Sequence, residues 1–206
     1  LSTRQISALG TAAIAALDST DFAALTSSQV AALSATQIRA IETTDLAAMA
    51  TDALVTISSD AISGLSTQQL SAMTSDQWSS LTTAQLRGLT TAQIADITTD
   101  DLTAMGTRQI ASLSNEQIVA LSTQQFRSLD SSDIAALGTD QLRAMETRDI
   151  AALESADFNA LTTAQIDALT AEQLRAVETV DITGISTQSL AAISASVITA
   201  LSTQQL

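Results

Sequence analysis

The chain has 206 residues, and its 22 Asp and Glu outnumber its 8 Arg, so that the net charge at pH 7 is −14. It contains no His, Cys, Lys or Pro, which removes the ligands of zinc and haem sites and most side chains that act as nucleophiles or general bases. Nucleic acid and anionic membrane surfaces attract clustered cations, so we expect neither as a partner. We predict that the chain is not an enzyme and that it has no catalytic residues, no metal ligands and no cofactor.

The hydrophobic fraction of 46% exceeds what is typical of disordered chains, so an ordered fold is expected. No apolar run approaches the ~18 residues that cross a bilayer, and we expect no insertion into a membrane.

A repeat of eight residues, here called an octad, runs through the whole chain. Twenty-five complete octads start at Leu1, and residues 201–206 add six residues of another, without any change of phase. Position 1 is Leu, Ile, Met or Val in all 26 copies, and position 6 is Ile, Leu, Phe, Val or Trp in all 26. Position 8 is Ala, Gly, Ser or Thr in 24 of 25 copies, with Asp96 as the exception. We therefore predict that positions 1 and 6 form the core and that something packs closely against position 8.

One continuous helix does not fit this period. Apolar steps of five and three residues average four, and the apolar stripe would turn by roughly 80° per octad around an ideal helix. In a strand, positions 1 and 6 would point to opposite faces. The octad must therefore contain a break in regular structure.

The break has the sequence features of a helix start. Position 2 is Ser, Thr, Asp, Glu or Gly in 25 of 26 copies, and position 5 is Gln or Asp in 21 of 26. This spacing is typical of a capping box with the N-cap at position 2, and it makes positions 1 and 6 a hydrophobic staple. Positions 2, 4 and 5 hold 20 of the 22 acids, whereas position 7 holds five of the eight Arg, in agreement with the helix dipole.

We predict an all-α solenoid of very short helices, one per octad, with about three octads per turn and with residues 1–206 forming a single continuous array. Helices of about six residues are unstable alone in water, so stacking between turns must stabilise them. The array starts at Leu1 and reaches Leu206 in mid-pattern. We therefore expect it to be part of a longer protein, or to associate end to end with other copies.

An acid at position 2 is always accompanied by Asp at position 5. One interpretation is that the paired carboxylates bind Ca²⁺, which prefers oxygen ligands. The other is that they stabilise helix N-termini and form ion pairs, since Arg39, Arg127, Arg143 and Arg175 each lie three residues before such an acid. The second interpretation is favoured. The six pairs are Asp18/Asp21, Glu42/Asp45, Asp130/Asp133, Glu146/Asp149, Glu154/Asp157 and Glu178/Asp181.

The repeat units resemble those of a known class of proteins. Residues 81–88 read L-T-T-A-Q-L-R-G, and residues 161–168 read L-T-T-A-Q-I-D-A. They are similar to the L-T-T-A-Q-I-x-A octapeptides of large repetitive proteobacterial surface or secreted proteins, often described as haem-utilisation or adhesion proteins. The resemblance implies an extracellular or cell-surface structural array. Haem binding finds no support in a chain without His, Cys or Tyr.

We therefore predict a structural module, namely a stalk, spacer or fibre-forming segment. A solenoid that binds protein or glycan, as in an adhesin, is one alternative, and a Ca²⁺-binding repeat array is another. Binding surfaces usually carry clustered aromatic residues or Arg. Trp78 and the three Phe all occupy position 6, so we expect them in the core and not at a ligand site.

Overall fold

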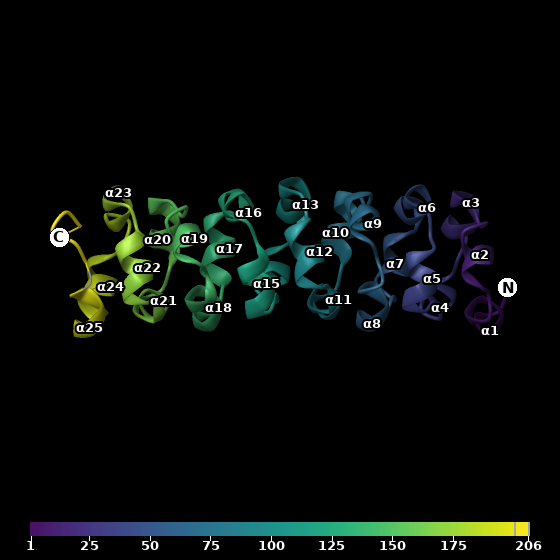
Figure 1. Cartoon of the computed structure of the whole chain (residues 1–206), viewed down its shortest axis with the longest axis horizontal. Coiled ribbons are helices and arrows are strands. Elements are labelled where there is room, and N and C mark those ends of the chain that lie inside the picture. Colours follow the sequence, from purple (N-terminus) through teal and green to yellow (C-terminus); the bar gives the residue numbers. More distant parts are fainter. Residues whose placement is uncertain (200, 206) are drawn as a thin grey trace. The chain divides into compact units, whose positions relative to one another are not determined.

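The computed structural model describes residues 1–199 and 201–205, and every regular element within them is a short helix. The chain divides into two compact units, Leu1–Ser112 and Leu113–Leu206. Each helix follows the preceding one after a bend of a few residues (Figure 1). The helices of unit 1 are α1 Thr3–Ser7, α2 Thr11–Ile14, α3 Ser19–Ala23, α4 Ser27–Val30, α5 Ala35–Arg39, α6 Thr43–Ala48, α7 Thr51–Leu54, α8 Ser59–Ile62, α9 Thr67–Ser71, α10 Ser75–Ser80, α11 Thr83–Gly88, α12 Thr91–Ala95, α13 Thr99–Ala104 and α14 Thr107–Ile110. Those of unit 2 are α15 Asn115–Ala120, α16 Thr123–Ser128, α17 Ser131–Ala136, α18 Thr139–Ala144, α19 Thr147–Ile150, α20 Ser155–Ala160, α21 Thr163–Ala168, α22 Ala171–Ala176, α23 Thr179–Ile182, α24 Thr187–Ala192 and α25 Ala195–Ile198.

Each helix begins at position 3 of its octad, so the predicted N-cap at position 2 is confirmed. In α9, the Ser66 hydroxyl accepts from the Gln69 amide at 3.2 Å, while the Gln69 side chain accepts from the Ser66 amide at 2.8 Å. This reciprocal pair satisfies two amides that a helix start leaves without an intrahelical partner. Where position 2 is glycine, as at Gly106, the acceptor on the N-cap is missing, but the Gln109 side chain still accepts from the Gly106 amide at 2.7 Å.

The core consists of positions 1 and 6, as predicted. Position 6 is buried in nearly every octad, and Trp78 and the three Phe are among the largest fully buried side chains. Position 1 is buried from Leu33 onward within the described residues, whereas Leu1 is 70% exposed. Leu9, Leu17 and Leu25 are half-buried. Position 1 is thus less covered in the first four octads. The first three have no earlier turn stacked on them in this chain, and the fourth has only α1. Leu206, the last predicted core residue, lies outside the described residues.

Helices stack on the third helix along the chain. In unit 1, α5 contacts α8 and α8 contacts α11; in unit 2, α17 contacts α20 and α20 contacts α23. Within each unit, three octads therefore form one turn, and the predicted all-α solenoid with about three repeats per turn is confirmed. None of the helices in the described part of the chain is long and apolar enough to cross a membrane.

Candidate functional site: the interface between successive turns

Glutamine at position 5 joins one turn to the preceding one. Gln69 is 3% exposed, and its Oε1 accepts from the backbone and hydroxyl of Ser66 within α9's own N-cap. Its Nε2 donates to the carbonyls of Ile38 and Ile41, 31 and 28 residues earlier, at 2.9 and 2.7 Å. These carbonyls lie at the end of α5 and in the bend that follows it. We call this arrangement a glutamine bridge.

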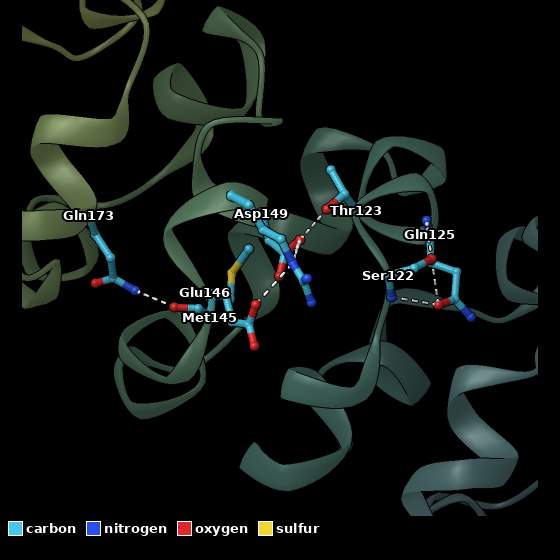
Figure 2. Close-up of polar contacts among 8 residues, drawn as sticks. Ser122, Thr123, Gln125, Met145, Glu146, Asp149 and Gln173 are labelled. Atoms are coloured by element: carbon cyan, nitrogen blue, oxygen red, sulfur yellow. Dashed lines mark hydrogen bonds and ion pairs between the residues drawn. The ribbon is translucent and has the colours of Figure 1, made fainter.

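The glutamine bridge recurs in both units with nearly constant geometry. The donor–acceptor distance from Nε2 to the carbonyl 28 residues earlier is 2.6–2.9 Å in each of the following cases. The glutamines are Gln37, Gln69, Gln77, Gln85, Gln93, Gln109, Gln141, Gln165, Gln173 and Gln205. Figure 2 shows the Nε2 of Gln173 directed at the carbonyl of Met145.

The chemistry of the bridge requires an amide. One end of the side chain must accept from the N-cap amide and the other must donate to two carbonyls, and only Asn and Gln carry both functions in one planar group. Carbonyls at a helix end have no intrahelical donor, and leaving a buried one unsatisfied costs about 1–3 kcal/mol. Position 5 therefore caps its own helix and also satisfies the end of a helix in the preceding turn.

Aspartate at position 5 uses a different partner in the preceding turn. The hydroxyl at position 3, 26 residues earlier, donates to the carboxylate in the cases given next, and we call this an aspartate bridge. The donor–acceptor distances are 2.6 Å for Ser19–Asp45, Thr123–Asp149 and Ser155–Asp181, and 2.8 Å for Ser131–Asp157. A carboxylate only accepts hydrogen bonds, so it pairs with a hydroxyl where glutamine pairs with carbonyls.

Asp149 differs from the other bridging aspartates in its surroundings. Its side chain is fully buried, and Oδ1 accepts the Thr123 hydroxyl (Figure 2). Oδ2 has no hydrogen-bond partner. The Nε of Arg148 lies 3.6 Å from Oδ1 but only 2.9 Å from the Glu146 carboxylate. Burial raises the pKa of Asp149 above its ordinary value, although the Thr123 hydroxyl, the charge of Arg148 and the backbone amide of Glu146 act in the opposite direction.

Position 8 makes the close contact that the sequence predicted. A Cβ added to Gly88 would lie 2.3 Å from the Ser59 carbonyl oxygen, and one added to Gly184 would lie 2.1 Å from that of Ser155. Gly64 has the same relationship to Ala35. In each case the contact is with position 3 of the helix one turn earlier, so the start of one helix packs against the end of the next.

The predicted ion pair between Arg143 and Glu146 needs correction. Glu146 pairs with Arg148, not with the predicted Arg143. The Nε of Arg143 instead donates to the Ala168 carbonyl at 3.2 Å, and that of Arg87 donates to the Ser112 carbonyl at 2.7 Å. Both acceptors are at position 8, 25 residues later. Arg87 and Arg143 thus extend along the stack to a helix-end carbonyl of the next turn, and Arg143 does not pair with the nearest acid along the chain.

Two of the acid pairs, Asp18/Asp21 and Asp130/Asp133, cap their helices through the acid at position 2, whereas the side chains of Glu42, Glu146 and Glu178 make no capping hydrogen bond. Asp130 Oδ1 accepts from the Ser132 and Asp133 amides at 2.8 and 2.9 Å, and Asp18 does the same with the Thr20 and Asp21 amides at 2.9 and 3.0 Å. Across residues 1–199 and 201–205, no group of three or more Asp and Glu lies close enough to hold a metal ion. These contacts favour the architectural interpretation of the pairs.

Sequence reasoning identified position 5 as a capping position but missed the bridges between turns. The acceptors of the glutamine bridge are backbone carbonyls, which leave no trace in the sequence. A weak signal for the aspartate bridge does exist, because every position-5 Asp from Asp45 onward has Ser or Thr 26 residues earlier. Position 3 is Ser or Thr in 22 of 26 octads, so this signal hardly exceeds the background.

Comparison with known families agrees with this periodic interface. The model of the ALTTAQ repeat matches residues 1–35, 38–75, 94–129, 116–147 and 142–179, which together cover well over half of the chain. The chain belongs to the ALTTAQ repeat family. The suspected relationship to proteins with L-T-T-A-Q-type octapeptides is thereby confirmed. A search among curated proteins found no match. The ALTTAQ octad is thus the unit that carries both the helix cap and the bridge to the preceding turn.

Proposed function

We propose that this ALTTAQ array is a structural spacer in an extracellular or cell-surface bacterial protein, and that it has no catalytic role. The observation that carries the proposal is the recurring bridge at position 5, where Gln or Asp joins one turn to the preceding one within each unit. Stability in such an array is a sum over neighbouring turns. Length can then change by whole repeats without redesign of any particular site, which is what a spacer requires.

The exposed side chains support a spacer more than a binding surface. Among the described residues, the large hydrophobic side chains that are exposed are Leu1, Val119 and Val180, and they are far apart in sequence. All aromatic side chains lie in the core. Binding sites for proteins are usually enriched in aromatic residues and Arg that cluster at their centre. The surface location rests on the resemblance to repetitive surface proteins.

We also propose that the array associates with further turns of the same repeat. Leu1 is 70% exposed, and Leu9 and Leu17 are half-buried, although later position-1 side chains are buried beneath a preceding turn. An added turn of the same repeat, in this chain or in a second copy, would cover them. Such a contact is head-to-tail and does not close on itself. Replacing Leu1 and Leu17 with Glu should abolish concentration-dependent association in analytical ultracentrifugation; unchanged association would contradict this contact.

The spacer function can be tested by lengthening unit 2 by one turn. Glu116 and Ala164 are both exposed, at position 4 of octads two turns apart, and the chain has no Cys, so E116C and A164C give a specific pair of dye sites. Duplicating residues 137–160 should increase the distance measured by single-molecule FRET by about 8–10 Å, the usual spacing of packed helices. The distribution should stay narrow.

The matched control replaces the duplicated turn with 24 residues of Gly and Ser, which should broaden the distribution. An unchanged distance, or an equally broad distribution for the duplicated turn, would contradict a spacer. The proposed location needs a separate test, for which we suggest antibody labelling of intact bacterial cells that make the full-length protein. Labelling only after the cells are broken would contradict a surface role.

A further inference from the structure

The buried carboxylate of Asp149 lacks a donor that its position normally requires. It lies in α19 and contacts α16 through Thr123, whose hydroxyl donates to Oδ1 at 2.6 Å. The side chain has no exposure to solvent, and Oδ2 has no partner. A buried acceptor without a donor is costly, and more so when it is ionised. A proton on Oδ2 would remove the charge and leave Oδ1 free to accept the Thr123 hydroxyl.

We propose that Asp149 is a proton-operated bridge between α16 and α19, and that its neutral form joins these two turns more tightly than its ionised form. The inference concerns a single octad and does not depend on the proposed spacer function. It predicts that mild acidification stabilises the interface between α16 and α19.

The charges around Asp149 do not supply the missing donor. Arg148 is the nearest cation. Its Nε is 2.9 Å from the Glu146 carboxylate but 3.6 Å from Asp149 Oδ1, so Arg148 interacts mainly with Glu146. Arg148 is also 63% exposed and therefore well screened by solvent. On the helices packed against α19, the charged side chains are Arg127 of α16 and Glu172 and Arg175 of α22. The charges that act on the Asp149 carboxyl are Arg148, which favours ionisation, and Glu146, which opposes it.

The direction of the pH effect follows from linkage. Burial raises the pKa of Asp149 in the folded chain, so between its ordinary pKa and the raised one the folded state binds more protons than the unfolded state. Stability therefore falls as the pH rises through this window. Above the raised pKa the full cost of the buried charge is present, and below the ordinary pKa that cost is absent.

Asp181 provides a matched control within the same unit. It also occupies position 5, is 9% exposed, and accepts a hydroxyl from the preceding turn at the same distance of 2.6 Å. Each carboxylate oxygen of Asp181 is either accessible to solvent or accepts a hydrogen bond. The two aspartates thus share the bridge and differ in the orphaned oxygen, so the same replacement at both sites isolates that difference.

The experiment compares the melting temperatures of the full chain, Asp149→Asn and Asp181→Asn by circular dichroism from pH 4 to pH 8. The amide introduced by Asp149→Asn would keep an acceptor for Thr123 and cannot ionise. We expect Asp149→Asn to melt a few degrees above the wild type at pH 8, with the difference shrinking towards pH 4. Asp181→Asn should not raise the melting temperature at any pH. Carboxyl carbon NMR of the wild-type chain should show Asp149 titrating above the ordinary range of aspartate.

The combined result is decisive whether or not a variant folds well, because the NMR titration uses the wild-type chain. A melting temperature of Asp149→Asn equal to or below that of the wild type across this range would overturn the proposal. So would an Asp149 titration within the ordinary range of aspartate, which would mean that a buried water or local motion satisfies Oδ2. Equal increases at pH 8 for both variants would also overturn it, because the effect would then belong to every aspartate bridge.

Discussion

The hydroxyl of Ser155, the first residue of α20, donates to Oδ1 of Asp181 in the first turn of α23 at 2.6 Å. The two residues are 26 apart in sequence and belong to helices stacked one turn apart. One hydrogen bond therefore links the starts of two helices, and its donor and acceptor can be exchanged independently by mutation.

We expect Ser155→Ala to destabilise the chain by about 1.5–3 kcal/mol, the usual contribution of a hydrogen bond to a charged group. The melting temperature would fall by roughly 2–4 °C for each kcal/mol. Ser155→Thr keeps the hydroxyl and should be close to the wild type, as Thr123 at the same position in α16 indicates. Because glutamine bonds to backbone carbonyls instead, adding Asp181→Gln to Ser155→Ala should recover part of the loss. No recovery in thermal denaturation would mean that the two kinds of bridge are not interchangeable.

The glutamine bridge can be tested with two adjacent residues of α9. Gln69 is buried and makes the bridge, whereas Gln68 is exposed. We expect Gln69→Met to cost about 1–3 kcal/mol, because it keeps the volume but leaves the Ile41 carbonyl without its donor. The Ile38 carbonyl would keep only the Ile41 amide, which donates to it at 3.2 Å. Gln68→Met should change stability by less than about 0.5 kcal/mol. Similar losses for both variants in chemical denaturation would contradict a specific role for the bridge.

Two glycines should respond to substitution with opposite signs. Gly88 ends α11, where Ala would ordinarily favour a helix. A Cβ there would meet the Ser59 carbonyl oxygen at 2.3 Å, so Gly88→Ala should instead destabilise by about 1–3 kcal/mol. Gly106 has ordinary φ and ψ of −83° and 155°, and Gly106→Ser would add a capping hydroxyl and restrict the unfolded chain. It should stabilise by about 0.5–1 kcal/mol. A stabilising Gly88→Ala would show that the turns separate easily.

The capping pattern allowed much of the fold to be predicted from sequence. Position 2 starts each helix, positions 1 and 6 form the core, and a two-residue bend cannot reverse the chain, which leads to three octads per turn. These features depend on local geometry and on burial, both of which repeat with the octad. The structure places Trp78, Phe22, Phe126 and Phe158 in the core for the same reason.

The contacts between turns could not be predicted in the same way. Gln69 and Arg143 both donate to backbone carbonyls, and every residue has one. The orientation of Arg143 along the stack rather than along the chain depends on which carbonyl remains unsatisfied after folding. The difference between Gly88 and the Ala found at position 8 in most octads depends on how closely two particular helices approach. The full burial of Asp149 likewise depends on the turns packed around it.

We expect the chain to be indifferent to Ca²⁺. Asp18 and Asp130 already accept two backbone amides each, and a Ca²⁺ ion would have to replace these bonds and recruit further oxygens. Binding with the ion at ten times its dissociation constant would stabilise the folded chain by about 1.4 kcal/mol, or roughly 3–6 °C. We predict a difference below about 1 °C between millimolar Ca²⁺ and a chelator. A larger increase would identify the acid pairs as ligands.

Comparing deletions of different length should show whether the octad is the unit of folding. Removing residues 81–104 takes out one whole turn of unit 1, and Gln109 would then lie where Gln85 now bridges to Leu54 and Ile57. Removing residues 89–96 takes out one octad and changes which helices stack, but the acceptors of the glutamine bridges are backbone carbonyls that every octad provides. Both deletions should therefore lower the free energy of unfolding only slightly for each remaining turn.

Removing Thr90 alone should be more damaging than removing either larger segment. The Thr90 hydroxyl accepts from the Gln93 amide at 3.2 Å, and Gln93 in turn donates to the Leu65 carbonyl at 2.6 Å. Without Thr90, Thr91 would become the N-cap and Gln93 would lie one residue too early to reach both partners. The loss of stability combines a missing cap, about 1 kcal/mol, with a broken buried bridge, about 1–3 kcal/mol.

Trp78, the single Trp of the chain, is fully buried in unit 1 and remains in all three variants, so its fluorescence can follow the unfolding of this unit. We expect the Thr90 deletion to lower that transition by roughly 4–16 °C, and more than the deletion of residues 89–96. If the two variants unfold at the same temperature, the octad is not the unit that stacks.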